Sequence, residues 1–230
     1  MRFFILLFFF LTYFLYSSNL IVASASNLSF VLPKIIKDFK SKYGCNVNLI
    51  FASSGVLSNQ ILHKAPFDIF LSADFKHPLL IYKRGYAINY PKVYANGKLV
   101  VVSKLKGKNL IDILKKANLV AIANPKIAPY GKAAYEVLNN LHIKPKLIYS
   151  NSVSGVANYF FTIADVGFIS KSLIYSQKFK NYRVLNINEN LYSPIKQGVV
   201  MLNNKKCTKE FFNYILSNRA KKVFKSYGYR

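Results

Sequence analysis

Small and hydroxyl-bearing residues recur at four places where a predicted strand runs into a predicted helix. The four turns are Ser26-Asn27, Ser53-Ser54-Gly55, Tyr130-Gly131 and Ser152-Val153-Ser154-Gly155. Backbone N–H groups at a helix N-terminus lack partners within the helix, and the helix dipole is positive there, so such a turn can bind an anion. A serine before a helix is most often only a cap, which is the better interpretation of any one turn alone. The recurrence along the chain favours a shared anion site.

The hydrogen-bond donors in these turns are neutral. None of the turns contains Arg, and the nearest Lys is Lys132, directly after Gly131. Neutral N–H and O–H groups at several helix starts can strip water from a small oxyanion and select its size without a fixed counter-charge. The pattern therefore predicts a site for a fully ionised tetrahedral dianion, which needs donors only.

Residues suited to catalysis are sparse. His63, His77 and His142 lie in Lys-rich helical or turn settings, without the converging ligands that a metal site needs. Asp68 and Asp74 stand at opposite ends of one predicted strand, which favours structural capping over a carboxylate pair. The sequence contains no Gly-x-Ser-x-Gly motif, Walker loop or complete Rossmann fingerprint. We therefore expect a binding protein that is not an enzyme.

The chain is strongly basic, with 33 Lys and Arg against 8 Asp and Glu among its 230 residues and a formal charge of +25. Such a charge is compatible with binding to nucleic acid or to an anionic membrane. The basic residues are scattered through every segment, however, and no run resembles a basic helix or a basic–aromatic motif. We favour a solvated Lys-rich surface, and keep a basic polyanion-binding protein as the alternative.

The first 18 residues have the pattern of a signal peptide: Arg2, an apolar run, then Ser17-Ser18. The run is shorter than the roughly 20 residues that a transmembrane helix needs. An uncleaved anchor is the alternative, because the segment has no obvious Ala-x-Ala cleavage site. We therefore expect an exported protein in the periplasm or another extracytoplasmic compartment.

The two cysteines, Cys45 and Cys207, are too few for a disulfide scaffold and form no Cys-x-x-Cys zinc motif. In an oxidising compartment they can pair, but sequence spacing does not test the geometry that a disulfide needs. Our expectation is that each is an unlinked, small packing residue.

Strands and helices alternate along the chain. Expected strands are 19–25, 47–51, 67–71, 99–103, 119–123, 146–149, 166–169 and 194–202. Expected helices are 28–43, 56–62, 78–84, 110–116, 132–141, 152–162 and 208–227. This alternation predicts an α/β protein with mainly parallel sheets, which bind ligands at the carboxyl ends of their strands. The four turns can meet in one cleft if the chain forms two lobes.

Six segments, in order, resemble the ModA family, the periplasmic molybdate-binding proteins of ABC importers. They are VASASNLSFVLPKIIKDF, FASSGVLSNQILHKAPFDIFLSAD, ANPKIAPYGKAAYEVL, NSVSGVANYF, YSPIKQGVVML and VFKSYGY. The resemblance implies a type II periplasmic binding protein fold, with two α/β lobes and a ligand cleft between them. We place one lobe at residues 19–100 plus about 196–230, and the other at about 101–195.

The resemblance also carries ligand-binding positions over onto this sequence. They are Ser26, Asn27, Ser54, Tyr130 and Val153. Either Ser26 or Asn27 serves the first turn, and Val153 would act mainly through its backbone N–H. Family members vary between Ala and Tyr at the position of Tyr130.

Two further positions are weaker candidates, Ser53 in the second turn and Ser170. Some family members place a Tyr hydroxyl where this chain has Ser170. Ser is too short to reach as far as that Tyr, so we expect the Tyr130 hydroxyl to supply the contact instead.

The resemblance implies molybdate, and usually tungstate, as ligand, so that molybdenum enters only as the oxyanion, without direct metal ligands and without any cofactor. It further implies an ABC permease in the inner membrane as partner. We expect a monomer that binds no nucleic acid. Another tetrahedral oxyanion, such as sulfate, remains the alternative ligand.

Overall fold

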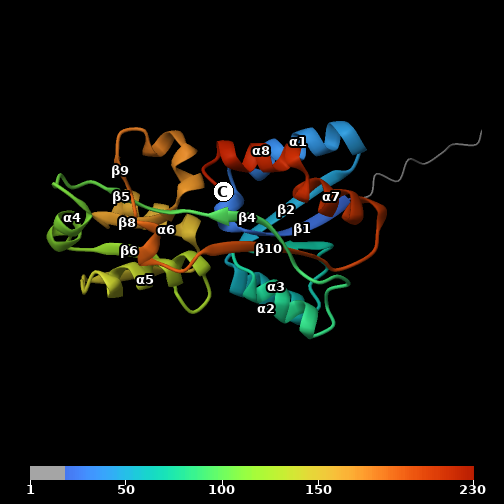
Figure 1. Ribbon diagram of the computed structural model, residues 1–230, viewed down its shortest axis with the longest axis horizontal. Coiled ribbons are helices and arrows are strands. Elements are labelled where there is room, and N and C mark those ends of the chain that lie inside the picture. Colours follow the sequence, from blue (N-terminus) through green and yellow to red (C-terminus); the bar gives the residue numbers. More distant parts are fainter. Residues whose placement is uncertain (1–18) are drawn as a thin grey trace, which may run out of the picture.

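Two five-stranded sheets, each covered by helices, lie next to each other in the computed structural model, which describes residues 19–230 (Figure 1). The predicted signal peptide at residues 1–18 lies outside the described residues. Within the described part of the chain, no helix is both long and apolar enough to cross a membrane.

The first sheet contains both ends of the described chain. In spatial order it is β2 (Asn46–Ala52), β1 (Asn19–Ala25), β3 (Ile69–Leu71), β10 (Ile195–Met201) and β4 (Lys92–Gly97). One face carries α1 (Leu32–Tyr43), α7 (Lys206–Leu216) and α8 (Asn218–Ser226), and the other carries α2 (Ser54–Leu62) and α3 (Lys76–Lys83) (Figure 1). Alternate apolar residues of β1 therefore enter two different cores, Val22 on the α1 side and Ala23 on the α2 side.

The second sheet is built from the middle of the chain. Its order is β7 (Leu147–Ser150), β6 (Val120–Ala123), β8 (Val166–Ser170), β5 (Leu99–Ser103) and β9 (Arg183–Asn186). Its helices are α4 (Leu110–Lys116), α5 (Pro129–Asn140) and α6 (Val153–Thr162), and short 3-10 helices are η1 (Ser26–Leu28), η2 (Lys171–Tyr175), η3 (Gln177–Phe179) and η4 (Glu189–Leu191). Its core is contiguous, and strand β5 is buried along its whole length.

Both sheets are mixed, but four of the five strands in each run in the same direction, as expected for mainly parallel sheets. Strands β1, β2 and β3 are parallel, as are β6, β7 and β8. Strand β10 is antiparallel to β3 and β4, and β5 is antiparallel to β8 and β9. The reason is connectivity: β4 leads directly into β5 in the other sheet, and β10 brings the chain back. Only β10 in the first sheet and β5 in the second run against the other strands of their sheet.

Three local predictions were wrong. Strand β4 was missed because Asn96-Gly97 is a typical turn pair, yet here it pairs with β10. Strand β9 was missed because it is short and largely exposed. The predicted helix 208–227 is two helices, because Ser217 adopts an extended conformation and its hydroxyl accepts a hydrogen bond from the Ala220 N–H.

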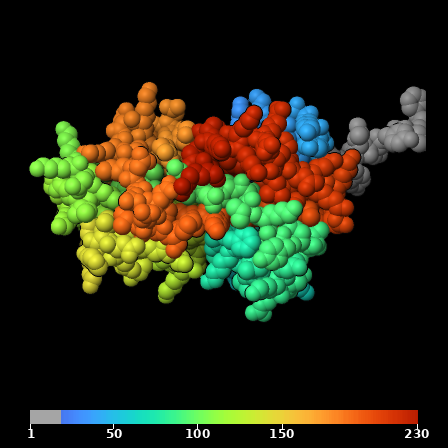
Figure 2. All heavy atoms as spheres, viewed as in Figure 1, coloured from blue at the N-terminus to red at the C-terminus, as the bar shows by residue number. Residues whose placement is uncertain are grey.

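The C-terminal end of the chain lies at the junction of the two sheets, where Figure 1 marks it and where dark red atoms lie in Figure 2. Arg230 exchanges two backbone hydrogen bonds with Asn96 of β4, at 2.8 and 2.9 Å. Its guanidinium pairs with Glu189 of η4, which follows the second sheet. The end of the chain is thus fixed to the crossing region.

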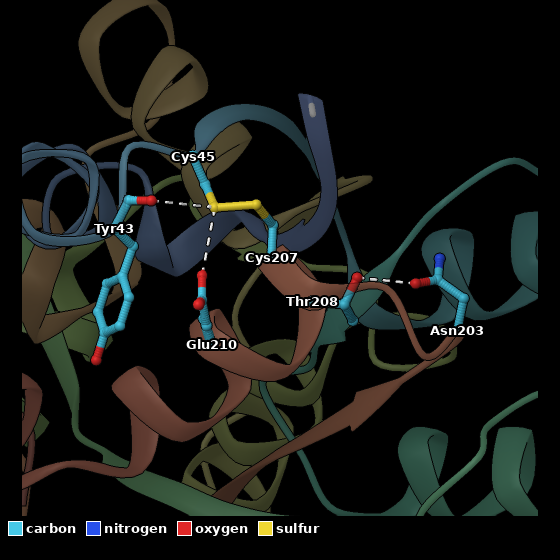
Figure 3. The surroundings of a disulfide bond; sticks show 6 residues. All are labelled: Tyr43, Cys45, Asn203, Cys207, Thr208 and Glu210. Carbon is cyan, nitrogen blue, oxygen red and sulfur yellow. Dashed lines mark hydrogen bonds between the residues drawn. A yellow bond between two sulfur atoms is a disulfide. The ribbon is translucent and has the colours of Figure 1, made fainter. Parts of the chain in front are cut away.

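Cys45 and Cys207 form a disulfide, so the expectation of two unlinked cysteines was wrong (Figure 3). Their Cα atoms are 6.1 Å apart, although 162 residues separate them in sequence. The bridge joins the residue before β2 to the first turn of α7, where the Thr208 hydroxyl also donates to Asn203. Glu210 lies beside the sulfurs, but both thiols are used in the disulfide, so this cluster of the described residues is no metal site.

Replacing both cysteines with Ser should lower the free energy of unfolding by about 2–5 kcal/mol, because a long closed loop no longer restricts the unfolded chain. Urea unfolding of oxidised wild type and of the double variant measures the difference. The midpoint of the variant should not respond to a reductant, whereas that of wild type should. Equal midpoints for the oxidised wild type and the variant would contradict a stabilising bridge.

Candidate ligand-binding site

A small cavity lies between the two sheets, where the predicted turns meet. Its lining residues are Ala25, Ser26, Asn27, Ser53, Ser54, Ala73, Ala128, Pro129, Tyr130 and Val153. None of them is charged. The cavity volume is about 10 Å³, which is room for roughly one water molecule.

The structure brings six of the seven sequence-predicted site residues to this cavity. They are Ser26, Asn27, Ser53, Ser54, Tyr130 and Val153. The seventh, Ser170, does not line the cavity but is fully buried, and its hydroxyl interacts with that of Tyr130. That these residues bind a ligand stays a prediction, taken up below.

Apart from Ala73, which lies between β3 and α3, each lining segment begins a helix directly after a strand or an extended residue. The 3-10 helix η1 starts at Ser26 where β1 ends, and α2 starts at Ser54 after Ser53 in extended conformation. On the other side of the cavity α5 starts at Pro129 and α6 at Val153. Free N–H groups and positive helix ends from both sheets therefore converge on one point.

Two serine hydroxyls in the cavity are oriented as donors. The Ser54 Oγ accepts a hydrogen bond from the Ala73 N–H at 2.9 Å. The Ser26 Oγ accepts one from the Ser154 N–H at 3.4 Å, and this bond joins the two sheets. A hydroxyl has a single proton, and when an N–H occupies its oxygen the proton remains to be donated elsewhere. Both serines are thereby prepared to donate to an anion.

Asn27 and Ser53, the other polar residues of the first two turns, differ in whether their side chains already have hydrogen-bond partners. The amide nitrogen of Asn27 donates to Gln197 at 3.1 Å and to the Tyr229 hydroxyl at 2.9 Å, which uses its protons away from a ligand. Its Oδ1 has no hydrogen-bond partner among the described residues, and neither has the buried hydroxyl of Ser53. Ser26 is therefore the stronger side-chain donor of the first turn, and the Ser53 hydroxyl is available to a ligand.

The Tyr130 hydroxyl is buried between the cavity and the crossing strands. Its oxygen accepts a hydrogen bond from the Gln197 Nε2 at 3.0 Å. Burial raises the pKa of Tyr130 well above the usual range of a phenol, and the bonds from Ser170 and Gln197 only partly oppose this. The hydroxyl therefore keeps its proton at neutral pH and can act as a donor.

A backbone contact closes the cavity from outside. The Gly55 N–H at the start of α2 donates to the Ile127 carbonyl oxygen at 2.9 Å, across the gap between the sheets. A Cβ atom at Gly55 would lie only 2.8 Å from that oxygen. The closed arrangement of the two sheets thus depends on glycine at this position.

A wider cleft of about 280 Å³ borders the cavity and shares two lining residues with it. Lys76 and His77 reach it from the first sheet, and Lys126 and Lys132 from the second. His77 pairs with Asp74 at 2.8 Å. Burial alone would raise the pKa of the Asp74 carboxyl, but hydrogen bonds and charge from His77 hold it below its usual range. Glu136 also lines the cleft and pairs with Lys132 at 3.7 Å, so three lysines against two carboxylates make a weakly basic approach to a neutral cavity.

The aspartates and histidines provide no catalytic group in the cavity. The buried Asp68 accepts hydrogen bonds from the Ile21 N–H and from Asn203, so its role is structural, as expected. His63 and His142 line neither the cavity nor the basic cleft beside it. The described residues around the cavity contain no pair of nucleophile and base.

Gln197 is the residue near the site that sequence reasoning missed. It is fully buried on β10 and contacts Asn27 and Tyr130 together. Its one indication in the sequence was a neutral polar residue in the strand Ile195–Met201, which is otherwise apolar except for Lys196. A buried polar side chain needs hydrogen-bond partners, but the sequence does not name them.

Comparison with known proteins defines the class. Residues 20–230 match the family model of bacterial extracellular solute-binding proteins. This agrees with two mixed α/β sheets that enclose a small polar cavity, and proteins of this class bind solutes and are not enzymes.

The relatives narrow the class. The molybdate-binding protein ModA of Rhodobacter capsulatus is 32% identical over 226 residues, covering 93% of this chain and 88% of its own length. ModA of Azotobacter vinelandii is 34% identical over 224 residues, covering 90% and 88%. The solved structure of the periplasmic molybdate-binding protein of Azotobacter vinelandii superposes with a TM-score of 0.85 at 29% identity, covering 92% and 98%. The chain belongs to the ModA family.

Substituting Gly55→Ala should hinder closure of the two sheets, because the new methyl group would collide with the Ile127 carbonyl. With molybdate, the ligand of the relatives, as probe, we expect affinity to fall by about 1–3 kcal/mol, the usual cost of overpacking. Isothermal titration measures the affinity. Asn59→Ala, at an exposed position of the same helix, is the matched control. An unchanged dissociation constant for Gly55→Ala would contradict this role of the contact.

Proposed function

We propose that the protein captures molybdate, and also tungstate, outside the cytoplasm and delivers it to an ABC importer. The observation that carries the proposal is the polarity of the cavity. Helix N-termini from both sheets meet there, and hydroxyls whose oxygens already accept N–H groups face a space without charged lining. A dianion without protons can accept from every such donor and has nothing to donate.

Individual residues take distinct roles in this proposal. The hydroxyls of Ser26, Ser54 and Tyr130 donate to the oxyanion, and Val153 donates through the first backbone N–H of α6. Tyr130 replaces the hydroxyl that some family members supply from the position of Ser170. Asn27 holds the first turn in place, and the unpartnered Ser53 hydroxyl is an additional donor.

Capture follows from movement of two lobes. We assign one lobe to residues 19–100 plus about 196–230 and the other to about 101–195. The crossing strands act as the hinge, and the closed cavity shown by the structure opens to admit the anion. Because the closed space is roughly the size of one water molecule, the lobes must close slightly less far around a tetrahedral oxyanion, which loses its hydration shell to the donors.

In this proposal the positive charge of the protein attracts the anion toward the site and contributes less to holding it in the cavity. The formal charge of +25 attracts anions at long range, and the lysines of the basic cleft stand next to the neutral cavity. The neutral cavity then selects among anions by the size of the anion and by whether its oxygens carry protons. Molybdate and tungstate have longer metal–oxygen bonds than the sulfur–oxygen bonds of sulfate, so a donor cage of fixed size can separate them.

The cellular setting is also proposed. Residues 1–18 direct export, and the mature protein works as a monomer in the periplasm or another extracytoplasmic compartment, without a cofactor and without nucleic acid. The Cys45–Cys207 bridge is compatible with an oxidising compartment. A permease in the inner membrane then receives the closed, loaded form.

Isothermal titration of the purified mature protein with molybdate, tungstate and sulfate tests the proposal. We expect submicromolar binding of molybdate, competition by tungstate, and no measurable binding of sulfate. Small-angle scattering should also show a smaller radius of gyration with saturating molybdate. Sulfate binding alone would assign a different cargo. Steeply salt-dependent DNA binding without any oxyanion binding would favour the polyanion alternative.

Tyr130→Phe should weaken molybdate binding by about 1–3 kcal/mol, because one oxygen of the buried anion loses its donor. Titration of the variant beside wild type gives the difference. Tyr135→Phe removes an exposed hydroxyl from the same helix and is the matched control. Equal affinities of Tyr130→Phe and wild type would rule out the tyrosine as a ligand donor.

A further inference from the structure

Gln197 links residues from both sides of the cavity through one amide group. Its Oε1 accepts from the Asn27 Nδ2 at 3.1 Å and from the Tyr94 hydroxyl at 2.8 Å, both on the first sheet's side. Its Nε2 donates to the Tyr130 hydroxyl at 3.0 Å, on α5 beside the second sheet. The side chain is fully buried, so water does not compete for these bonds.

The contact between Gln197 and Tyr130 lies at the crossing strands. Gln197 is on β10, where the pairing with β4 shifts register between Gln197 and Gly198. A Cβ atom on Gly97 would lie 2.6 Å from the Gln197 Nε2 and would also collide with the Tyr130 hydroxyl. The two polar groups therefore fill the space that glycine leaves open at the proposed hinge.

Three of the four hydroxyls that line the cavity accept a hydrogen bond from an N–H group, and only for Tyr130 does this N–H belong to a side chain. Ser54 and Ser26 accept from the backbone N–H groups of Ala73 and Ser154, which cannot turn around. Tyr130 accepts from a side-chain amide, which can present either its nitrogen or its oxygen. Whether the tyrosine proton is free for a ligand thus depends on how the amide of Gln197 is held.

We propose that Gln197 is a positioning residue for oxyanion binding. Its Nε2 donates to the oxygen of the Tyr130 hydroxyl and so directs the proton of that hydroxyl to the ligand, while its Oε1 binds Asn27, which lies with Gln197 in the lobe opposite Tyr130. The inference rests on the proposed function, because it assigns Tyr130 as a ligand donor.

The neighbours of Gln197 maintain this orientation. Turned around, Nε2 would face the Asn27 Nδ2, and two donors would meet in a buried space. Oε1 would then accept the Tyr130 proton and take it away from the ligand. Only a joint rotation of both amides avoids the clash. It would present the Asn27 Nδ2 to the ligand in place of the now unpartnered Oδ1, so that Asn27 and not Tyr130 would be the donor.

The test is a double-mutant cycle on oxyanion affinity. Gln197→Met, Tyr130→Phe and the double variant are titrated with whichever of molybdate, tungstate and sulfate the wild type binds. Each single variant should bind about tenfold more weakly. The double variant should bind within about twofold of Tyr130→Phe, because Gln197 acts through the tyrosine proton.

Gln197→Glu provides a second, nearly isosteric variant that still accepts from Asn27 and Tyr94. Its carboxylate accepts the Tyr130 proton and adds a negative charge, so we expect weaker binding than for Gln197→Met. Its penalty should be smaller in the Tyr130→Phe background. If Gln197→Met fails to fold, this pair carries the test. Tyr214→Phe, which removes a hydroxyl bonded to Asp38 outside the cavity, is the control for lost stability, and we expect wild-type affinity.

The outcomes separate the inference from the proposed function. Additive losses in the cycle, with wild-type binding intact, would overturn the role of Gln197 alone. Weaker binding by Gln197→Met beside unchanged binding by Tyr130→Phe would indicate the rotated amides and would also overturn it. A wild type that binds none of the three oxyanions would overturn the proposed function, and this inference with it.

Discussion

The rest of the site depends on one constraint: the hydroxyls of Ser26, Ser54 and Tyr130 each accept a hydrogen bond from an N–H group. The fourth hydroxyl of the cavity lining, on Ser53, has no hydrogen-bond partner among the described residues. An anion held without a counter-charge is stable in a dry space only if every neighbouring group donates. The Ala73 and Ser154 N–H groups impose that polarity on Ser54 and Ser26. Carboxylates would oppose it, and none lines the cavity. The fold therefore sets these hydroxyls as donors without a ligand, which in the proposed function favours a negatively charged ligand.

The donors come from two sheets, and this division makes closure part of binding. Helices α2 and η1 belong with the first sheet, whereas α5 and α6 belong with the second. In the proposed function neither group alone surrounds the anion, so full coordination requires the two sheets to approach each other, as they do where the Gly55 N–H donates to the Ile127 carbonyl. The crossing strands β4, β5 and β10 connect the two groups, and the C-terminal Arg230 is bonded across the same region. In the proposed function, the binding free energy of the anion then includes the free energy of bringing the two sheets together.

Local features of the fold and site could be predicted from sequence, whereas long-range ones could not. Strand β1 was predicted with its observed bounds, because an apolar run ends there at a polar turn. The turns that contain Ser26, Ser54 and Val153 could be predicted to share one cleft because each begins a helix after a strand, a pattern visible within a few residues, and all three residues line one cavity. The antiparallel pairing of β10 depends on the return of the chain from the second sheet, and no local pattern encodes it. The Cys45–Cys207 bridge likewise joins residues that meet only through tertiary packing.

Gln197 shows why the second layer of such a site escapes sequence reasoning. A ligand-facing serine is constrained by its own turn, but a residue that orients a ligand-facing group is constrained by partners from distant segments. Here those partners are Asn27, Tyr94 and Tyr130, which come from three elements. A neutral amide suits this place better than a charged group, since a carboxylate would repel the anion and an ammonium could supply no acceptor for Asn27. The same neutrality that the cavity imposes on its lining thus extends to the residue behind it.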